Sequence, residues 1–315
     1  MDDILTVTLN PALDIATETA AVSPGPKLRC SDPVFDPGGG GVNVSRAIKK
    51  LKGSSRAFLL AGGPFGDLLL SALEAEGIET EVLKVKGMTR ISLAVFDESI
   101  SDQFRFILPG PEISPEEAKA AMDRIVGLAQ DRGIVVLSGS QAPGIAETFP
   151  ARLCARLNEA GVRLFVDTSG APLKNLVDAE DARPFFLRLN RSEAEEIAGG
   201  RFAKIQDAAD FGTGLVARGA AKFVAIGFDA EGSLLVSKSK QLFCQAPPVP
   251  ARSKTGAGDS FMAAFVLSIA GKECVETALR RGVAASAAAV MSEATKLCGA
   301  ADTELLLEGC RLREI

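Results

Sequence analysis

The sequence predicts a doubly wound α/β domain with a mainly parallel central sheet, on three observations. The chain has 315 residues, enough for one large α/β domain. From residue 115 onward, amphipathic helical segments alternate with short apolar strands, which is typical of strand-helix-strand units. Several of these strands end in polar residues, at the end of a doubly wound sheet where ligands bind. Apart from two β-rich excursions no boundary divides the chain, so we predict one domain spanning residues 1–315.

The amino-terminal part contains the first buried strand, expected at residues 4–9. This strand leads to Asp14, whose carboxylate can accept hydrogen bonds from hydroxyl groups of a ligand, although a turn residue explains the pattern equally well. A run of four glycines at residues 38–41 precedes a helix with apolar residues at 44, 47, 48 and 51. Glycines cost backbone entropy, so this run indicates that something approaches the backbone closely.

Two β-prone excursions interrupt the alternation of strands and helices. One lies near residues 16–36, and the other is a hairpin of strands 90–96 and 103–108 around a polar tip. We expect residues 12–36 and 88–109 to form a small sheet outside the main domain. Such a sheet can act as a lid over a cleft, as a dimer interface, or as both.

The second half supplies the remaining strands and helices. Asn190 follows a strand and opens a helix, with Glu193 three residues later, so the pair can either orient a metal-bound nucleotide through water or cap the helix. The expected helices are 115–129, 146–160, 205–218, 274–291 and 303–312, and the expected strands are 134–138, 162–167, 185–189, 223–227 and 233–236.

The stretch from Ser253 to Ser260 carries the strongest chemical signal. Its glycines can turn the backbone so that successive N–H groups point outward at the start of an apolar helix, an arrangement that suits a phosphate. Asp259 in this positive end can accept a proton, which suggests phosphoryl transfer to a hydroxyl. The same pattern is also typical of a simple helix cap, so the stretch alone leaves both interpretations open.

Composition excludes several classes of protein. The chain lacks His, Tyr and Trp, so it has no Ser-His-Asp triad and no histidine-ligated zinc. Its net charge of −5 argues against a nucleic-acid partner. The six cysteines form no CxxC pair, and no apolar run reaches the ~20 residues that span a bilayer. We expect a cytoplasmic protein without a membrane partner.

Two further phosphate-binding motifs are excluded. The Gly212–Gly214 pattern imitates a dinucleotide fingerprint, but it lies late in a helical segment and precedes a strand, so a dehydrogenase is disfavoured. No GxxxxGK[ST] loop is present.

Three motifs occur together in a specific order: the glycine run ending at Asn43, Asn190-x-x-Glu193, and Thr255-Gly-Ala-Gly-Asp259. With them the chain resembles the ribokinase-type (PfkB) carbohydrate kinases along its whole length. The segments Asn10–Asp14, Lys27–Cys30 and Ser138–Ser140 resemble those of the bacterial phosphofructokinase and tagatose-6-phosphate kinase branch. The resemblance implies a three-layer α/β/α sandwich with a β lid, and a homodimer formed through that lid.

The resemblance also implies the roles of individual residues. Asp259 is the base, with Gly256, Ala257 and Gly258 as the anion hole. ATP and Mg2+ are the implied cofactors: Asn190 and Glu193 act on Mg–ATP, with Glu193 nearest the metal. Arg188, where the branch often has lysine, and the loop of Gly227 and Gly232, longer than usual, contact the nucleotide. The implied substrate-binding residues are Asp14, Lys27, Gly39, Gly40, Asn43, Arg90, Arg105, Ser138 and Gly139, with Arg29 reaching into a partner subunit.

Cations in the expected lid favour a phosphosugar over a neutral sugar. Lys27, Arg90 and Arg105 all fall there, which favours fructose 6-phosphate and transfer to its C1 hydroxyl. Fructose 1-phosphate and tagatose 6-phosphate need almost the same residues, so they too are candidate acceptors. The motifs are also compatible with a neutral-sugar or nucleoside kinase and with a non-catalytic sugar-phosphate-binding protein.

Overall fold

The computed structural model describes residues 3–130, 133–253, 255–292 and 295–315. Within this part of the chain, ten strands form one large sheet in the order β14-β13-β12-β11-β10-β9-β8-β1-β4-β5, and four form a small sheet in the order β3-β2-β6-β7. The strands of the large sheet are β1 (Ile4–Thr8), β4 (Arg56–Ala61), β5 (Glu79–Lys84), β8 (Ile134–Ser138), β9 (Arg163–Asp167), β10 (Phe186–Asn190), β11 (Phe223–Gly227), β12 (Gly232–Ser237), β13 (Gln241–Gln245) and β14 (Arg311–Glu314).

The large sheet is parallel from β5 to β11 and antiparallel from β12 to β14. Ten helices flank it in the described chain: α1 (Gly40–Lys50), α2 (Gly63–Ala75), α3 (Pro115–Ala129), α4 (Phe149–Glu159), α5 (Gly170–Asp178), α6 (Arg191–Ala198), α7 (Ile205–Ala217), α8 (Ala257–Ala270), α9 (Val275–Met291) and α10 (Ala300–Leu307). None of the described helices is long and apolar enough to cross a bilayer.

Helices cover both faces of the large sheet, so the structure confirms the expected three-layer α/β/α fold. Successive residues of a strand point to opposite faces, and in β8 Val135 packs with α3, α4 and α5, whereas Ile134 and Val136 pack with α1, α8 and α9. A parallel sheet covered on both faces buries its strands on both sides and so favours nearly continuous apolar runs. This arrangement explains why β1 and β8 are buried throughout.

Helix α8 packs against the middle of the sheet through aromatic side chains. Phe265 lies 4.3 Å from Phe186 of β10 between ring centroids, and it stacks on Phe261 at 5.8 Å. Both α8 phenylalanines are almost fully buried. This packing fixes the amino-terminal end of α8 relative to the ends of the parallel strands.

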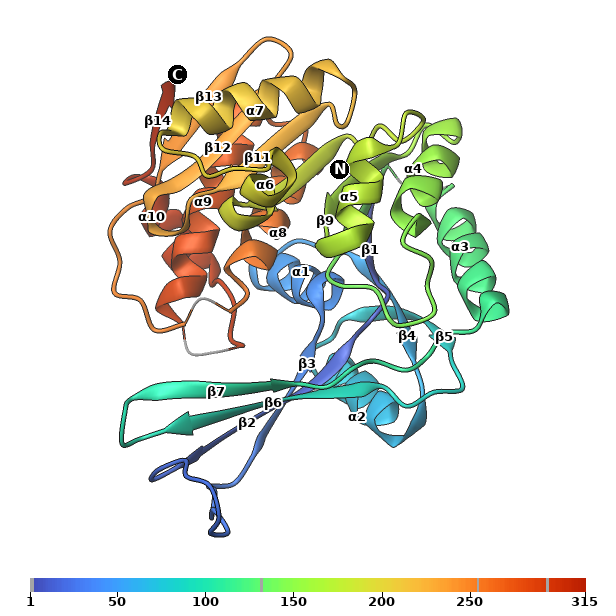
Figure 1. Cartoon of the computed structure of the whole chain (residues 1–315), viewed down its shortest axis with the longest axis vertical. Helices are drawn as coiled ribbons and strands as arrows, with labels where there is room; N and C mark the ends of the chain where they lie inside the picture. The colour runs from blue at the N-terminus through green and yellow to red at the C-terminus, as the bar shows by residue number, and fades with distance from the viewer. Residues whose placement is uncertain (1–2, 131–132, 254, 293–294) are drawn as a thin grey trace.

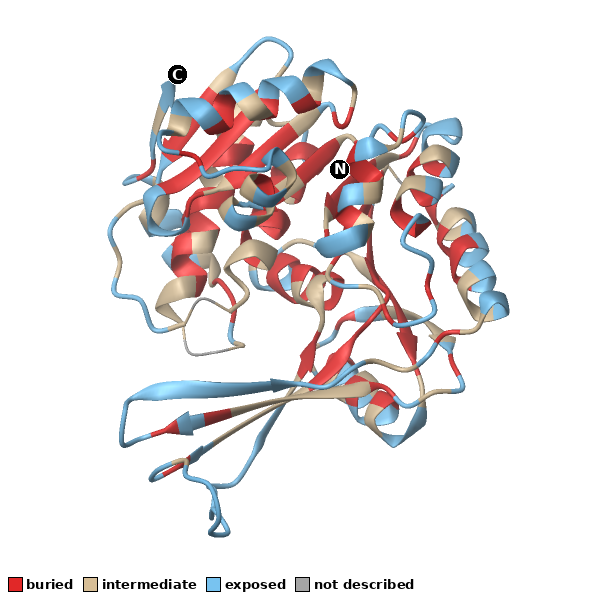
Figure 2. Cartoon of the chain, in the orientation of Figure 1, coloured by how far each residue is buried: buried red, intermediate tan, exposed pale blue. Residues whose placement is uncertain are grey.

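The small sheet extends from one side of the molecule, away from the large sheet (Figure 1). It consists of β2 (Ala12–Thr19), β3 (Val34–Gly38), β6 (Arg90–Asp97) and β7 (Asp102–Ile107). Figure 2 shows that much of this sheet is exposed or half-buried, in contrast to the buried strands of the large sheet. Strand β3 leads directly into α1, so the small sheet is connected to the main body through the glycine run.

The structure differs from the sequence-based element assignment at three places. A short helix, α5, was not predicted, and α4 begins at Phe149 rather than at residue 146. The predicted carboxyl-terminal end of the helix expected at 303–312 was wrong. Helix α10 ends at Leu307, and residues 311–314 form β14 beside β13. Local sequence did not reveal β14 because pairing with β13 stabilises this strand, and that contact is distant in the chain.

Candidate active site

The amino-terminal end of α8 lies beside the carboxyl ends of the parallel strands. Gly256 is the N-cap, with φ of 75°, a left-handed conformation that glycine adopts without steric cost. The first helical hydrogen bond is donated by the amide of Ser260 to the carbonyl of Gly256 at 2.8 Å. The amides of Ala257, Gly258 and Asp259 precede this bond, so they have no acceptor within the helix and can bind an anion.

Asp259 lies in this first turn and has two side-chain partners. Asn43 of α1 donates a hydrogen bond from Nδ2 to Oδ2 of Asp259 at 3.1 Å, and the Ser138 hydroxyl is 3.4 Å from Oδ1. Burial and the nearby Asp167 carboxylate raise the pKa of Asp259 to about 7, although Asn43, Arg188 and Ser138 each act to lower it. A carboxyl group with a pKa in this range is well suited to take a proton from a hydroxyl at neutral pH.

The glycine run and the end of β8 are in close contact next to this base. A Cβ atom on Gly40 would come within 2.5 Å of both the Ser138 hydroxyl and the Gly139 amide nitrogen. Gly39, with φ of 110°, lies against Thr8 at the end of β1 and against Pro11 just before β2. The structure therefore brings four predicted substrate-binding residues, Gly39, Gly40, Ser138 and Gly139, to one place beside Asp259.

Arg188 of β10 faces the first turn of α8. Its Nη1 donates a hydrogen bond to Oδ2 of Asp167 at 2.9 Å, and its guanidinium lies 5.6 Å from the centroid of the Phe261 ring. A Cβ atom on Gly258 would approach Arg188 Nη1 to 2.8 Å, and one on Gly227 would approach Nη2 to 3.5 Å. A cation held beside the amides of α8 adds to their attraction for a phosphoryl group.

A second charged group lies on one face of the small sheet. Asp14 pairs with Ser92, and Arg90 and Arg105 occupy neighbouring rows on the same face. Burial raises the pKa of Asp14 to about 6, while Arg90 and Arg105 act to lower it. Burial lowers the pKa of Arg90, and its guanidinium also donates two long hydrogen bonds, 3.3 and 3.4 Å, to the carbonyl of Asn10. This face combines a hydroxyl acceptor with two cations.

Lys27 is the predicted substrate-binding residue that the structure does not bring to this group. It lies exposed in the connection between β2 and β3, which extends away from the large sheet (Figure 1). Arg29 lies in the same exposed connection. Within a single chain these two cations are therefore apart from Asp259.

Asn190 and Glu193 form a capping box on α6. The Glu193 amide donates to Asn190 Oδ1, and the Asn190 amide donates to Glu193 Oε2, each at 2.8 Å. Burial raises the pKa of Glu193, and the Asp167 carboxylate contributes to the same direction. The helix-cap interpretation is thus realised, and the Glu193 carboxylate also interacts electrostatically with Asp167 and Arg188.

The two glycines of the expected nucleotide loop have different surroundings. Gly227 ends β11 next to Arg188, whereas Gly232 is buried against β13, where a Cβ atom would overlap the Cys244 carbonyl. Between them a short 3-10 turn, Asp229–Glu231, reverses the chain. The close packing of β12 against β13 therefore explains why residue 232 is a glycine.

The carboxylates fit a metal that is held mainly by nucleotide phosphates. No group of three or more His, Cys, Asp or Glu side chains in the described chain could hold a metal by itself. Magnesium-like ions in phosphoryl-transfer sites use only one or two carboxylates, together with phosphate oxygens and water. Asp167 at the end of β9 and Glu193 in the first turn of α6 interact electrostatically and are carboxylates of the kind that such a metal would need.

Asp167 is a site residue that the sequence interpretation missed. It ends the parallel strand β9, and it both holds Arg188 and raises the pKa of Asp259. The signal that could have found it was its position: an acidic residue at the carboxyl end of a buried strand, the same criterion that identified Asp14.

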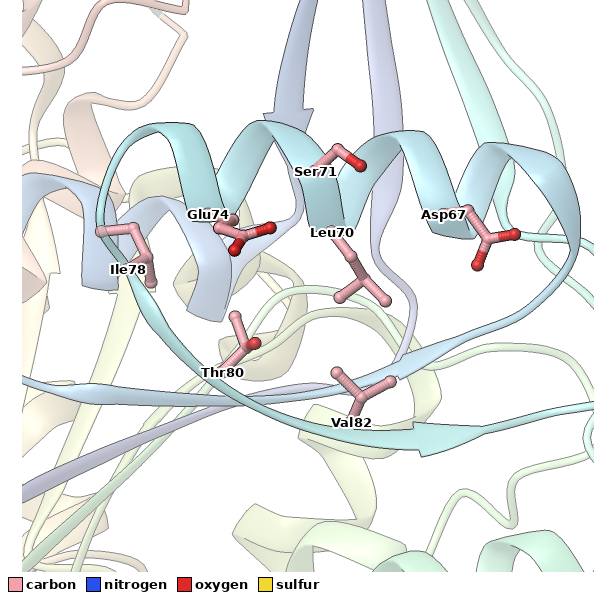
Figure 3. A pocket seen from close by; sticks show the side chains of 7 residues that line it. All are labelled: Asp67, Leu70, Ser71, Glu74, Ile78, Thr80 and Val82. Atoms are coloured by element: carbon pink, nitrogen blue, oxygen red, sulfur yellow. The ribbon is translucent and has the colours of Figure 1, made fainter.

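A hollow elsewhere on the surface does not share this chemistry. It lies between α2 and β5 and is lined by residues that include Asp67, Glu74 and Thr80 (Figure 3). Its charged side chains are both acidic, so it would repel a phosphosugar or a nucleotide.

A buried carboxylate beside a helix amino terminus, with the Arg188 guanidinium next to both, suits the transfer of a phosphoryl group to a hydroxyl. The chain belongs to the family described as pfkB family carbohydrate kinase, whose model matches residues 7–302. It is therefore an ATP-dependent sugar kinase, and such enzymes use ATP with a divalent metal.

Individual relatives are phosphofructokinases. The chain is 34% identical over 301 residues to ATP-dependent 6-phosphofructokinase isozyme 2 of Escherichia coli, covering 96% of both proteins. It is 31% identical over 290 residues to 1-phosphofructokinase of Bacillus subtilis, covering 92% of this chain and 93% of the relative. The crystal structure of Escherichia coli phosphofructokinase-2 in complex with fructose-6-phosphate superimposes with a TM-score of 0.91, covering 98% of this chain and 99% of that one.

Proposed function

We propose that this enzyme is a 6-phosphofructokinase, which transfers the terminal phosphoryl group of ATP to the C1 hydroxyl of fructose 6-phosphate. The observation that carries the proposal is the placement of Asp259, with its raised pKa, in the first turn of α8 beside Arg188, Asn43 and Ser138. The similarity to 6-phosphofructokinases at 34% identity supports the same acceptor.

In this mechanism the base acts on the acceptor hydroxyl. Asp259 takes the proton of that hydroxyl, and Asn43 and Ser138 hold the carboxylate in position. The amides of Ala257 and Gly258 donate hydrogen bonds to the transferred phosphoryl oxygens, and Arg188 neutralises their charge. ATP supplies the phosphoryl group, and the divalent metal, which we propose is Mg2+, neutralises the charge of its phosphates. Asp167 and Glu193 would hold that metal.

The acceptor sugar would lie between the glycine run and the small sheet. Asp14, Asn43 and the backbone of Gly39 and Gly40 would accept or donate hydrogen bonds to its hydroxyls, while Arg90 and Arg105 would bind its phosphate. The small sheet would then act as a lid of a single kinase domain spanning residues 1–315. Closure of a lid excludes water, which strengthens each of these charged interactions.

The test is ATP consumption measured with a panel of neutral sugars, fructose 6-phosphate, fructose 1-phosphate and tagatose 6-phosphate. Arg90→Ala is expected to raise KM for fructose 6-phosphate about 10- to 100-fold, because a charge-assisted contact is lost, with a smaller change in kcat. Arg124→Ala, which removes an exposed arginine from α3, is the matched control and should leave KM unchanged.

Other outcomes of this assay would indicate another acceptor sugar or another class of protein. Faster turnover of fructose 1-phosphate would indicate a 1-phosphofructokinase, the activity of the Bacillus subtilis relative. An unchanged KM in Arg90→Ala would indicate a neutral acceptor. Binding without turnover for every compound would indicate a sugar-phosphate-binding protein.

We also propose that two copies associate through their small sheets. On the face opposite Asp14, Phe35, Ile15, Leu93 and Phe106 form one row across all four strands. Phe35 and Phe106 are 51% and 49% exposed, which is unusual for a row of large apolar side chains on a monomer. A homodimer would bury this row and would also bring Lys27 and Arg29 of one subunit near the other. A solved Escherichia coli phosphofructokinase-2 structure is described as tetrameric, so association is observed in a relative.

Substitution of this row tests the dimer. Phe106→Ser combined with Phe35→Ser should convert a dimer to a monomer in sedimentation velocity and should raise KM for the phosphosugar. Leu305→Ser removes another exposed apolar residue, 72% exposed, from α10, and is expected to leave the assembly unchanged. A dimer that persists in the double variant would refute this interface.

The thiols suggest where the enzyme works. All six cysteines are free, and four of them are buried. Free thiols are typical of a reducing compartment, so we propose a cytoplasmic location.

A further inference from the structure

Arg46 is a buried charge that none of the proposed catalytic steps uses. It lies in α1, three residues after Asn43, and only 3% of its side chain is exposed. Burying an arginine is costly unless each of its donors is paired, so its partners show what it holds together.

The main partner of Arg46 is Glu76, the C-cap of α2. Arg46 Nε and Nη2 donate to the two carboxylate oxygens of Glu76, with the shortest distance 2.6 Å. This bidentate pair fixes the plane of the guanidinium. The remaining nitrogen, Nη1, is thereby directed toward the glycine run.

Through Nη1, Arg46 contacts the site itself. It donates to the carbonyl of Pro37 at 2.9 Å and lies 3.5 Å from Oδ1 of Asn43. An asparagine side chain can rotate by half a turn and exchange its oxygen and nitrogen. A donor facing Oδ1 fixes the orientation in which Nδ2 points to Asp259, where the 3.1 Å hydrogen bond forms.

The same guanidinium also contacts the small sheet. Arg46 Nη2 lies 3.5 Å from Oδ1 of Asp36 in β3, the strand that leads from the small sheet into α1. Asp36 pairs in register with Asp14, the proposed sugar-binding carboxylate, and its other oxygen is hydrogen-bonded to the Thr295 hydroxyl. One buried side chain thus joins the end of α2, Asn43 of α1 and strand β3 of the small sheet.

We propose that Arg46 is a positioning residue for phosphoryl transfer: it fixes the Asn43 amide against the Asp259 carboxylate and ties strand β3 to that same amide. This inference rests on the proposed role of Asp259 as the base. It assigns a function to the charge of Arg46 that packing of α1 alone does not require. Lysine cannot replace it, because a single ammonium group lacks the planar fork that pairs with Glu76 and Asn43 together.

The experiment compares Arg46→Lys with the wild-type enzyme over a range of pH. We expect kcat to fall about 10-fold, the value of one lost charge-assisted hydrogen bond, with KM for ATP unchanged. The Asn43 hydrogen bond lowers the pKa of Asp259, so its loss should move the rising limb of the kcat profile to higher pH. In an Asn43→Ala background the Arg46→Lys change should produce no additional shift, because the two residues act through one hydrogen bond.

Two further variants serve as a control and as a second test of the Arg46 contacts. Arg56→Lys changes an arginine that also pairs with two carboxylates, those of Glu79 and Glu81, but lies on β4, and it should leave the profile unchanged. Glu76→Gln weakens the anchor from a partly exposed position, and should shift the limb in the same direction as Arg46→Lys even if that variant folds poorly. If Arg46→Lys and Glu76→Gln both keep the rising limb of the wild-type kcat profile, Arg46 has a structural role only. If Asp259→Asn retains turnover, the proposed base itself is wrong, and that outcome is distinct from failure of the Arg46 proposal.

Discussion

Asp259→Asn is expected to lower kcat by about 10³- to 10⁴-fold while ATP binding is retained. Asparagine has almost the same shape as aspartate and can keep a contact with Ser138, so the site geometry should survive. What is lost is the acceptor for the hydroxyl proton. The chain has no histidine, and the other nearby carboxylate, Asp167, is already paired with Arg188.

The pH dependence of the wild-type enzyme follows from the same carboxylate. Because the pKa of Asp259 is raised to about 7, the fraction of active base increases as pH rises through neutrality, and kcat should rise with it and then level off. The raised pKa also means that ionising this group opposes folding: the cost is absent below the unfolded pKa, near 3.8, and complete above about 7. Asp259→Asn should therefore raise Tm at pH 8 and leave it unchanged at pH 4.

Asp302→Asn is the matched control for this variant. Asp302 is also an acidic residue in the first turn of a helix, but it lies exposed on α10. It should retain wild-type kcat. An Asp259→Asn enzyme with kcat within 10-fold of wild type would contradict the assignment of the base.

Gly258→Ala is expected to lower kcat by about 10²- to 10³-fold, the loss found when one anion-stabilising donor is removed. The added Cβ atom would lie 2.8 Å from Arg188 Nη1 and would displace the guanidinium from the phosphoryl position. The obstructed group is the end of a flexible side chain, so the fold should be kept. Alanine in a helix is also favoured over glycine, so Tm should not fall.

Gly127→Ala provides the control for this substitution. Gly127 also lies in a helix, α3, but a Cβ atom there would meet nothing within 4 Å. Its kcat should be unchanged. Measured by single-turnover kinetics, a normal phosphoryl-transfer step in Gly258→Ala would show that the position of the Arg188 guanidinium does not matter for stabilising the transferred group.

Local sequence indicated most of the candidate site because its geometry depends on backbone conformation. The glycines at 38–41, 256 and 258 allow a close approach or a left-handed turn, and such requirements are visible in the residue types themselves. The parallel order of the strands could be inferred from their alternation with helices, and parallel strands place their polar ends at one edge. The family membership expected from the three motifs is confirmed.

Long-range contacts were not predictable in the same way. Asp167 and Arg188 meet because β9 and β10 are neighbours in the sheet, and Asn43 reaches Asp259 across 216 positions of the chain. The assignment of β14 failed for the same reason, since only β13 makes it a strand. Lys27 was grouped with Arg90 by position in the predicted lid, yet the β2–β3 connection holds it apart within one chain.

Sequence thus determined the fold class and the family and made Asp259 the proposed base, because periodicity and glycine conformation are properties of short segments. The tertiary structure alone decided the protonation behaviour of that base. Burial and the charges of Asp167 and Arg188 set the pKa of Asp259, and each arises from elements distant in the chain. The same holds for Arg46, whose partners outside its own helix lie in β3 and at the end of α2.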